Sequence, residues 1–152
     1  METLLTKKLD KTLIIGIGNN TRQDDGLGWC FLDALEKEGY NTDNLLYKYQ
    51  LMVEDAETIS YYDTVIFVDA SKDNLKNGFS IEPLKASSKF EFTTHSVPPN
   101  QILNLCETVY HKTPKAFVIK IEGFKWNYKI LLSKQAKLNL KKALLSFKKL
   151  SK

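Results

Sequence analysis

The sequence predicts a single three-layer α/β/α domain, spanning residues 1–152, around a central, mostly parallel twisted sheet. The length of 152 residues fits one domain. Continuous apolar runs, such as TLIIGI at Thr12–Ile17 and TVIFV at residues 64–68, are typical of strands buried on both faces. These runs alternate with segments of helical periodicity, which is the order that gives a parallel sheet covered by helices.

The first half of the chain supplies two apolar strands, a shorter strand and two helices. In chain order we expect a strand at Thr12–Ile17, a loop at 18–24, a helix at about 25–38, a strand at 45–50, a short helix at 54–59 closed by 61–63, and a strand at 64–68. The first helix ends at Gly39, because glycine readily adopts the left-handed conformation that terminates helices. Asp69 stands at the carboxyl end of the last of these strands.

The second half supplies an edge strand, a third apolar strand and two helices. We expect a polar turn at 72–78, a strand at Phe79–Leu84, a helix from the Ser96, Pro98 and Pro99 start signal to about Tyr110, a strand at 116–121 ending near Gly123, and a helix from near Ser133. Pro83 restricts its strand to an edge, since proline has no N–H for the ladder. The buried stripe of the last helix is Ala136, Leu140, Ala143, Leu144 and Phe147.

The composition is that of an ordinary globular protein, with 43% hydrophobic and 26% charged residues. This balance excludes a disordered chain, a collagen and a coiled coil. The apolar runs are far shorter than the roughly 18–20 residues of a membrane span, and residues 1–11 lack the apolar core of a signal peptide. Cys30 and Cys106 form no CxxC motif and are interpreted as reduced thiols that fill the core. We therefore expect a cytoplasmic protein without a membrane partner.

The net charge of +4 comes from lysines crowded at the C-terminus. The lysines concerned are Lys134, Lys137, Lys141, Lys142, Lys148, Lys149 and Lys152. A charge run of this kind is usually the solvated face of a terminal helix. Neither interleaved aromatic residues nor a known binding module accompanies it, so we expect no nucleic-acid partner.

Candidate site residues follow the predicted strands, because ligands of open α/β sheets bind beyond the carboxyl ends of the strands. Asp24 and Asp25 lie in the loop after the first strand, Asp69 ends another strand, and His95 precedes the helix start at Pro98. A carboxylate at the end of an apolar strand is costly unless it is paired or ligating. Two carboxylates and one imidazole form a donor set for zinc, nickel, iron or manganese.

Simpler interpretations of the same residues remain open. Asp24 or Asp25 can cap the following helix, and a lone histidine such as His95 is more often structural than a ligand. His111 has no acidic partner in the sequence nearby and is interpreted as structural. Gly16 and Gly18 suit a dinucleotide fold, but the third glycine of GxGxxG is replaced by Thr21, and no acid ends the second strand.

The order and spacing of these residues resemble one protein family. An apolar strand is followed by Gly16-Ile17-Gly18-Asn19, four further residues and Asp24-Asp25-Gly26-Leu27-Gly28, and later blocks read Val-Asp-Ala at 68–70 and a histidine before prolines at 95–99. This pattern resembles the hydrogenase maturation proteases over nearly the whole chain. Trp29, Tyr110, Pro114 and residues 116–121 resemble the branch that serves bidirectional or soluble hydrogenases.

The resemblance implies an endopeptidase that removes the C-terminal extension of a nickel–iron hydrogenase large-subunit precursor after nickel insertion. It implies that Asp25, Asp69 and His95 are the catalytic, metal-binding trio. The metal is then nickel supplied by the precursor, for which other divalent ions substitute, and the protease is a monomer. The residues that shape the loop are Gly16, Gly18, Asn19, Asp24 and Gly26.

The chain departs from the family pattern at two places. Asp25 stands where many members have the longer glutamate, and residues 125–129 read KWNYK where relatives often have an acidic, glycine-bearing stretch. The main alternative function is a chaperone that checks the metal of the same subunit without cleaving it. A receiver-like phosphoacceptor domain, using Asp24, Asp25 and Asp69, and a dinucleotide-binding oxidoreductase are weaker alternatives.

Overall fold

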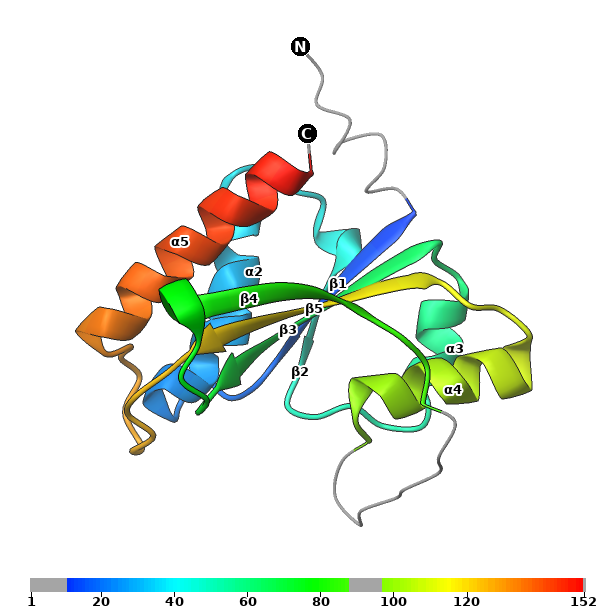
Figure 1. The fold of residues 1–152 in the computed structure, drawn as a ribbon, viewed down its shortest axis with the longest axis horizontal. Coiled ribbons are helices and arrows are strands. Elements are labelled where there is room, and N and C mark those ends of the chain that lie inside the picture. The colour runs from blue at the N-terminus through cyan, green and yellow to red at the C-terminus, as the bar shows by residue number, and fades with distance from the viewer. Residues whose placement is uncertain (1–10, 88–96, 152) are drawn as a thin grey trace.

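The computed structural model describes residues 11–87 and 97–151 of the chain. Its five-stranded sheet has the order β2-β1-β3-β5-β4 (Figure 1). The strands are β1 (Thr12–Ile17), β2 (Leu45–Lys48), β3 (Thr64–Ser71), β4 (Phe79–Leu84) and β5 (Lys115–Glu122). The helices are α2 (Leu27–Lys37), α3 (Asp55–Ser60), α4 (Pro99–Tyr110) and α5 (Lys134–Leu150), with short 3-10 turns at η1 (Gln23–Gly26), η2 (Thr42–Asn44) and η3 (Lys76–Gly78).

The three predicted layers are present, with α2 and α5 on one face of the sheet and α3 and α4 on the other (Figure 1). Side chains of the strands alternate between the two faces, as the pleat requires. In β3, Ile66 and Val68 pack toward α2 and α5, whereas Val65 and Phe67 pack toward α3 and α4. Both faces of the central strands are therefore buried, which accounts for their continuous apolar sequences.

The sheet is mixed because its edge strand runs against the others. β1 pairs in parallel with β2 and β3, and β3 pairs in parallel with β5. β4 pairs antiparallel with β5, and its Pro83 lies opposite Phe117. The edge strand predicted from Pro83 is confirmed, since only one side of an edge strand needs ladder donors.

The predicted elements are correct in kind and order, and three boundaries differ by two residues or more. β3 continues to Ser71 because β5 extends to Glu122 and pairs with it throughout, so Asp69 lies within the strand and not at its end. β2 ends at Lys48, before the predicted residue 50. The helix predicted from about residue 25 begins as the 3-10 turn η1 and becomes α-helical at Leu27.

The last helix presents its lysines outward, as predicted. Its buried side contains Ala136, Ala143 and Phe147, as predicted, and also Asn139, which was not part of the predicted stripe. Five lysines of α5 are exposed, while Lys148 pairs with Glu38. Cys30 is half-buried and Cys106 is buried, and both are free thiols. Within residues 11–87 and 97–151, none of the helices combines the length and apolar character that crossing a membrane requires.

Candidate functional site

Asp25 and Asp69 line one cavity of about 320 Å³ beside the ends of β1 and β3. The cavity is lined by Ile17, Gly18, Asp25, Tyr49, Gln50, Leu51, Asp69, Val97 and Pro99. Its walls thus come from the loop after β1, the segment after β2, strand β3 and the start of α4. This is the edge of the sheet at which open α/β folds bind their ligands.

Asp69 reaches this cavity because of its register in β3. It lies opposite Ile17 of β1 and Lys120 of β5. Two-residue alternation places its side chain on the face of Phe67, the face that α3 and α4 cover. Burial and the nearby charge of Asp25 raise the pKa of Asp69 to about 7, although a hydrogen bond from the backbone of Ala70 and the charge of Lys120 oppose the increase.

Asp25 is the third residue of η1, and the same physical causes act on its carboxyl group. Burial raises its pKa, and the positive charges of Arg22 and Lys72 oppose the increase. The structure therefore brings together two carboxyl groups that are 44 residues apart in the sequence and that repel one another when both are ionised. A pair of this kind can share a proton or hold a cation, and oxygen donors suit divalent metal ions.

The loop before Asp25 is held by contacts that exclude side chains. Gly18 has φ of +147°, and its N–H donates to the carbonyl of Lys48 at 2.9 Å. A Cβ at Gly18 would lie 2.0 Å from the carbonyl oxygen of Asp25. A Cβ at Gly28 would lie 2.5 Å from the carbonyl oxygen of Val68. The first turn of α2 thus packs backbone to backbone against the central strands.

Three further residues that the sequence singled out as shaping the loop, one of them in β1, make local contacts. Asn19 accepts hydrogen bonds through Oδ1 from the N–H and the hydroxyl of Thr21, at 2.9 and 2.6 Å. A Cβ at Gly16 would lie 2.7 Å from the carbonyl oxygen of Gly28, and one at Gly26 would lie 2.8 Å from Cα of Asn20. These contacts keep the turn compact around Asp25.

Asp24 points away from the cavity and is fully buried. Its carboxylate accepts four hydrogen bonds, from the N–H groups of Phe124, Lys125 and Ser133 and from the hydroxyl of Ser133, at 2.7 to 3.0 Å. Burial alone would raise the pKa of Asp24, but these bonds outweigh it and lower the pKa below its ordinary value. The alternative that Asp24 or Asp25 caps the following helix is wrong, because neither η1 nor α2 has a side-chain cap.

The connection between β5 and α5, residues 123–133, is tied to η1 along its length. Besides the bonds to Asp24, Gln23 N–H donates to the Lys129 carbonyl and Asn127 N–H donates to the Gln23 side chain. Arg22 lies 5.3 Å from the ring centre of Tyr128, and Lys72 lies 5.2 Å from that of Trp126. Sequence reasoning flagged this segment as a departure but did not pair Ser133 with Asp24, because the two residues are 109 positions apart.

The third member of the expected trio, His95, lies outside the described residues. Across residues 11–87 and 97–151, no three histidine, cysteine or acidic side chains form a metal-binding cluster. The donor set that is described, two carboxylates on one cavity, fits a hard or borderline divalent cation. His111 is at the C-terminal end of α4 with φ of +54° and a backbone bond to Glu107, in keeping with the predicted structural role.

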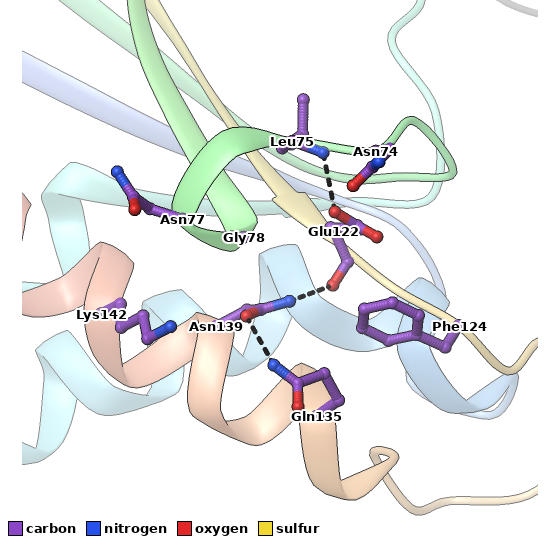
Figure 2. A pocket seen from close by; sticks show the side chains of 9 residues that line it. All are labelled: Asn74, Leu75, Asn77, Gly78, Glu122, Phe124, Gln135, Asn139 and Lys142. Atoms are coloured by element: carbon purple, nitrogen blue, oxygen red, sulfur yellow. Dashed lines mark hydrogen bonds between the residues drawn. The ribbon is translucent and has the colours of Figure 1, made fainter.

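A second cavity, of about 350 Å³, lies between the turn at η3, the end of β5 and helix α5 (Figure 2). Figure 2 shows Asn139 between Lys142 on one side and Glu122 on the other, with the ring of Phe124 beside Glu122. Asn139 donates to the Glu122 backbone carbonyl at 3.0 Å, and the Glu122 carboxylate accepts from the N–H of Leu75 at 2.7 Å. This cavity has no counterpart in the sequence analysis.

The solved structures that share this fold include several hydrogenase maturation endopeptidases. The hydrogenase maturating endopeptidase HybD from Escherichia coli aligns with a TM-score of 0.70 and 19% identity, covering 90% of this chain and 89% of that one. The NiFe hydrogenase maturation protease HycI from Thermococcus kodakarensis aligns with a TM-score of 0.66 and 23% identity, covering 97% of each chain. At these identities the likeness shows the fold.

Comparisons of the sequence add no family. No protein-family model matches the chain, and no curated protein matches it. The sheet order disfavours the receiver-like alternative. Doubly wound receivers have the strand order 2-1-3-4-5, whereas in this chain β5 lies between β3 and β4, and β4 is an antiparallel edge strand. That the chain belongs to the maturation-protease branch serving bidirectional or soluble hydrogenases, as Trp29 suggests, stays a prediction.

Proposed function

We propose that this protein is an endopeptidase that removes the C-terminal extension of a nickel–iron hydrogenase large-subunit precursor once nickel has been inserted. The observation that carries the proposal is the pair Asp25 and Asp69, two carboxylates from separate elements on one cavity. The whole-length likeness to solved maturation proteases and the sequence blocks around both residues support it. The sequence features near Trp29 favour a precursor of the bidirectional or soluble kind.

In this proposal the metal arrives with the substrate. Asp25 and Asp69, together with His95, are the side chains that would ligate a nickel ion already held by the precursor, and other divalent ions would substitute. A metal ion held in this way supplies Lewis acidity toward the scissile carbonyl. Only a precursor with its metal in place then completes the site, so that cleavage follows metal insertion.

The residues of the chain itself have separable tasks. Asp69, half-buried in the sheet, is positioned by the register of β3 and presents its carboxylate to the cavity. Asp25 is held in place by the tight loop at Gly18; burial raises its pKa, and the charges of Arg22 and Lys72 oppose the increase. Both carboxylates line the cavity, where a divalent cation would be able to bind them.

The test is a processing assay with purified components. Wild type, Asp69→Asn and His95→Ala are incubated with nickel-loaded and nickel-free precursor from the same source, and the loss of the extension is followed by gel mobility. Trimming of the nickel-loaded precursor alone, reduced at least about 10³-fold in both variants, is the expected result, because several kcal/mol of transition-state stabilisation is removed. Asp73→Asn, an exposed carboxylate elsewhere, is the matched control and trims normally.

Two other results would change the assignment. If wild type binds the nickel-loaded precursor but does not trim it, the chain is a metal-checking chaperone and not a protease. If Asp69→Asn trims at the wild-type rate, the two carboxylates are not the site of the reaction.

A further inference from the structure

The connection at residues 123–133 exposes an unusual amount of apolar surface. Tyr128 is 82% exposed and Ile130 is 78% exposed, and Phe124 and Leu131 are also exposed. We call Phe124, Tyr128, Ile130 and Leu131 the apolar loop face. Single exposed apolar residues are common, but four within eight positions form a patch of the kind that marks an interaction site.

The apolar loop face is presented by a firmly held backbone. The buried carboxylate of Asp24 binds both ends of the connection, at Phe124 and Lys125 on one side and at Ser133 on the other. Burying a carboxylate is unfavourable unless its hydrogen bonds are satisfied. The charge-assisted hydrogen bonds of Asp24 are strong, and they hold the backbone of this connection in place. A surface fixed before contact loses less conformational freedom on binding than a mobile one.

Cations surround the apolar loop face. The connection itself carries Lys125 and Lys129 and no acidic residue. Arg22 stacks on Tyr128, and Lys72 stacks on Trp126, so that two more positive charges are drawn to the same segment. A basic surface with apolar side chains at its centre complements a partner segment that is acidic and apolar.

We propose that the apolar loop face, with Lys125 and Lys129, is the docking surface for an acidic, apolar segment of the protein substrate. The inference rests on the proposed function and adds the chemistry by which the precursor is selected. Asp24 links the surface to the candidate site, since it holds the connection while its neighbour Asp25 lines the reacting cavity. Docking here would therefore orient the substrate relative to Asp25.

The neighbouring cavity favours a polypeptide over a membrane surface as the occupant. Phe124 belongs both to the apolar loop face and to the wall of the second cavity (Figure 2). The other walls include the exposed amides of Asn74 and Asn77. Side-chain amides carry donors and acceptors that match the N–H and C=O groups of a peptide backbone, whereas lipid acyl chains carry neither.

The test measures the kinetics of trimming of the nickel-loaded precursor by two loop variants. Tyr128→Ala with Ile130→Ala removes apolar contact, and Lys125→Glu with Lys129→Glu reverses the charge. Matched controls are Tyr61→Ala with Val109→Ala, exposed residues of the α3 and α4 ends, and Lys137→Glu with Lys141→Glu on α5. We expect each loop variant to raise KM at least tenfold with kcat within twofold, and each control to leave both values unchanged.

The charge-reversal variant also provides a signature that a merely structural role would not produce. Its KM defect should shrink as salt is raised, because screening weakens the attraction that wild type uses. An unchanged KM in both loop variants would overturn the docking proposal while leaving the proposed protease intact. Loop-dependent binding to vesicles of anionic phospholipid, with an unchanged KM, would overturn it in favour of a membrane surface. Failure of wild type to trim or bind the precursor would instead overturn the proposed function, and the docking proposal with it.

Discussion

Asp24 and Asp25 are adjacent in the chain, yet their surroundings shift the pKa of the carboxyl group in opposite directions. One region, which we call the anchor, consists of Asp24 with Phe124, Lys125 and Ser133. Here the carboxylate of Asp24 is fully buried, receives four hydrogen bonds and has a lowered pKa. In the cavity region, Asp25 and Asp69 face one another's charge and both have raised pKa values. The anchor stabilises the fold through its ionised carboxylate, whereas the cavity keeps ionisable groups at a cost in stability.

The difference indicates what each region is for. Carboxylates whose protein environment disfavours ionisation are enriched at functional sites, although ion-pair networks also perturb pKa values. A cation brought into the cavity would remove the disadvantage at once, while nothing needs to be added at Asp24. In the proposed function the motif Asp24-Asp25 thus combines one structural and one functional acid, and substitutions in each region should separate stability from activity.

Replacing Asp24 should have the largest effect on stability. Asp24→Ala leaves four donors without their acceptor and should lower the free energy of unfolding by about 4 kcal/mol or more. Urea denaturation measures the loss. The exposed Asp73→Ala is the control and should change stability by less than about 0.5 kcal/mol. A loss below about 1 kcal/mol in Asp24→Ala would remove the basis for calling this region an anchor.

The close packing of Gly28 in α2 against the central strands should contribute nearly as much to the free energy of unfolding. Gly28→Ala places a Cβ against two backbone carbonyls, those of Val68 and Ile17, and should cost about 3 kcal/mol. Gly39→Ala is a useful comparison, since it meets no atom within 4 Å and suffers only from its φ of +95°, so about 1 kcal/mol is expected. Equal losses in the two variants would show that α2 is not closely packed on the strands.

The pH dependence of stability should reveal Asp69. Its pKa is raised in the folded protein to about 7 from an unfolded value near 4, so the folded state holds an extra proton between these limits. Its contribution to stability is therefore fully present below about pH 4 and is lost as the pH rises through about 7. Relative to Asp69→Asn, metal-free wild type should lose on the order of 2–3 kcal/mol across this range in urea titrations. Parallel profiles for the two proteins would contradict the raised pKa.

Replacing Ser133, which also belongs to the anchor, should cause the smallest loss of stability. Its hydroxyl donates to Asp24 at 2.7 Å and also accepts from the N–H of Ala136 as the N-cap of α5. Ser133→Ala removes both interactions but leaves the backbone donor to Asp24, so a loss of about 1–2 kcal/mol is expected. Thermal denaturation measures it, and Ser133→Thr, which retains the hydroxyl, should recover most of the stability.

Much of the fold could be predicted from the sequence because its signals are local. Apolar runs identified β1, β3 and β5, and Pro83 identified the edge position of β4. The end of β3 was misplaced because its length is set by pairing with β5, and no local pattern records that partner. The 3-10 turn η1 was not foreseen ahead of α2, because Gln23 and Asp24 are held there by hydrogen bonds to residues 123–133, which are distant in the sequence.

The candidate site was predictable only where position along a strand decides it. Asp25 and Asp69 could be selected because each follows the apolar run of a predicted strand, and ligands bind at the carboxyl edge of parallel sheets. The anchor could not be foreseen, since Ser133 joins Asp24 only after the chain has returned through the whole sheet. The proposed docking surface could not be foreseen either, because it depends on exposure and on the stacking of Arg22 and Lys72, which are properties of the folded chain.

In the proposed function, the two cavity carboxylates are kept for the reaction at the expense of stability. The most direct test measures unfolding free energy and precursor trimming for Asp69→Asn and wild type in the same buffer at pH 8. We expect the variant to be more stable than metal-free wild type and not to trim the nickel-loaded precursor. A variant that is less stable than wild type, or that trims at the wild-type rate, would contradict it.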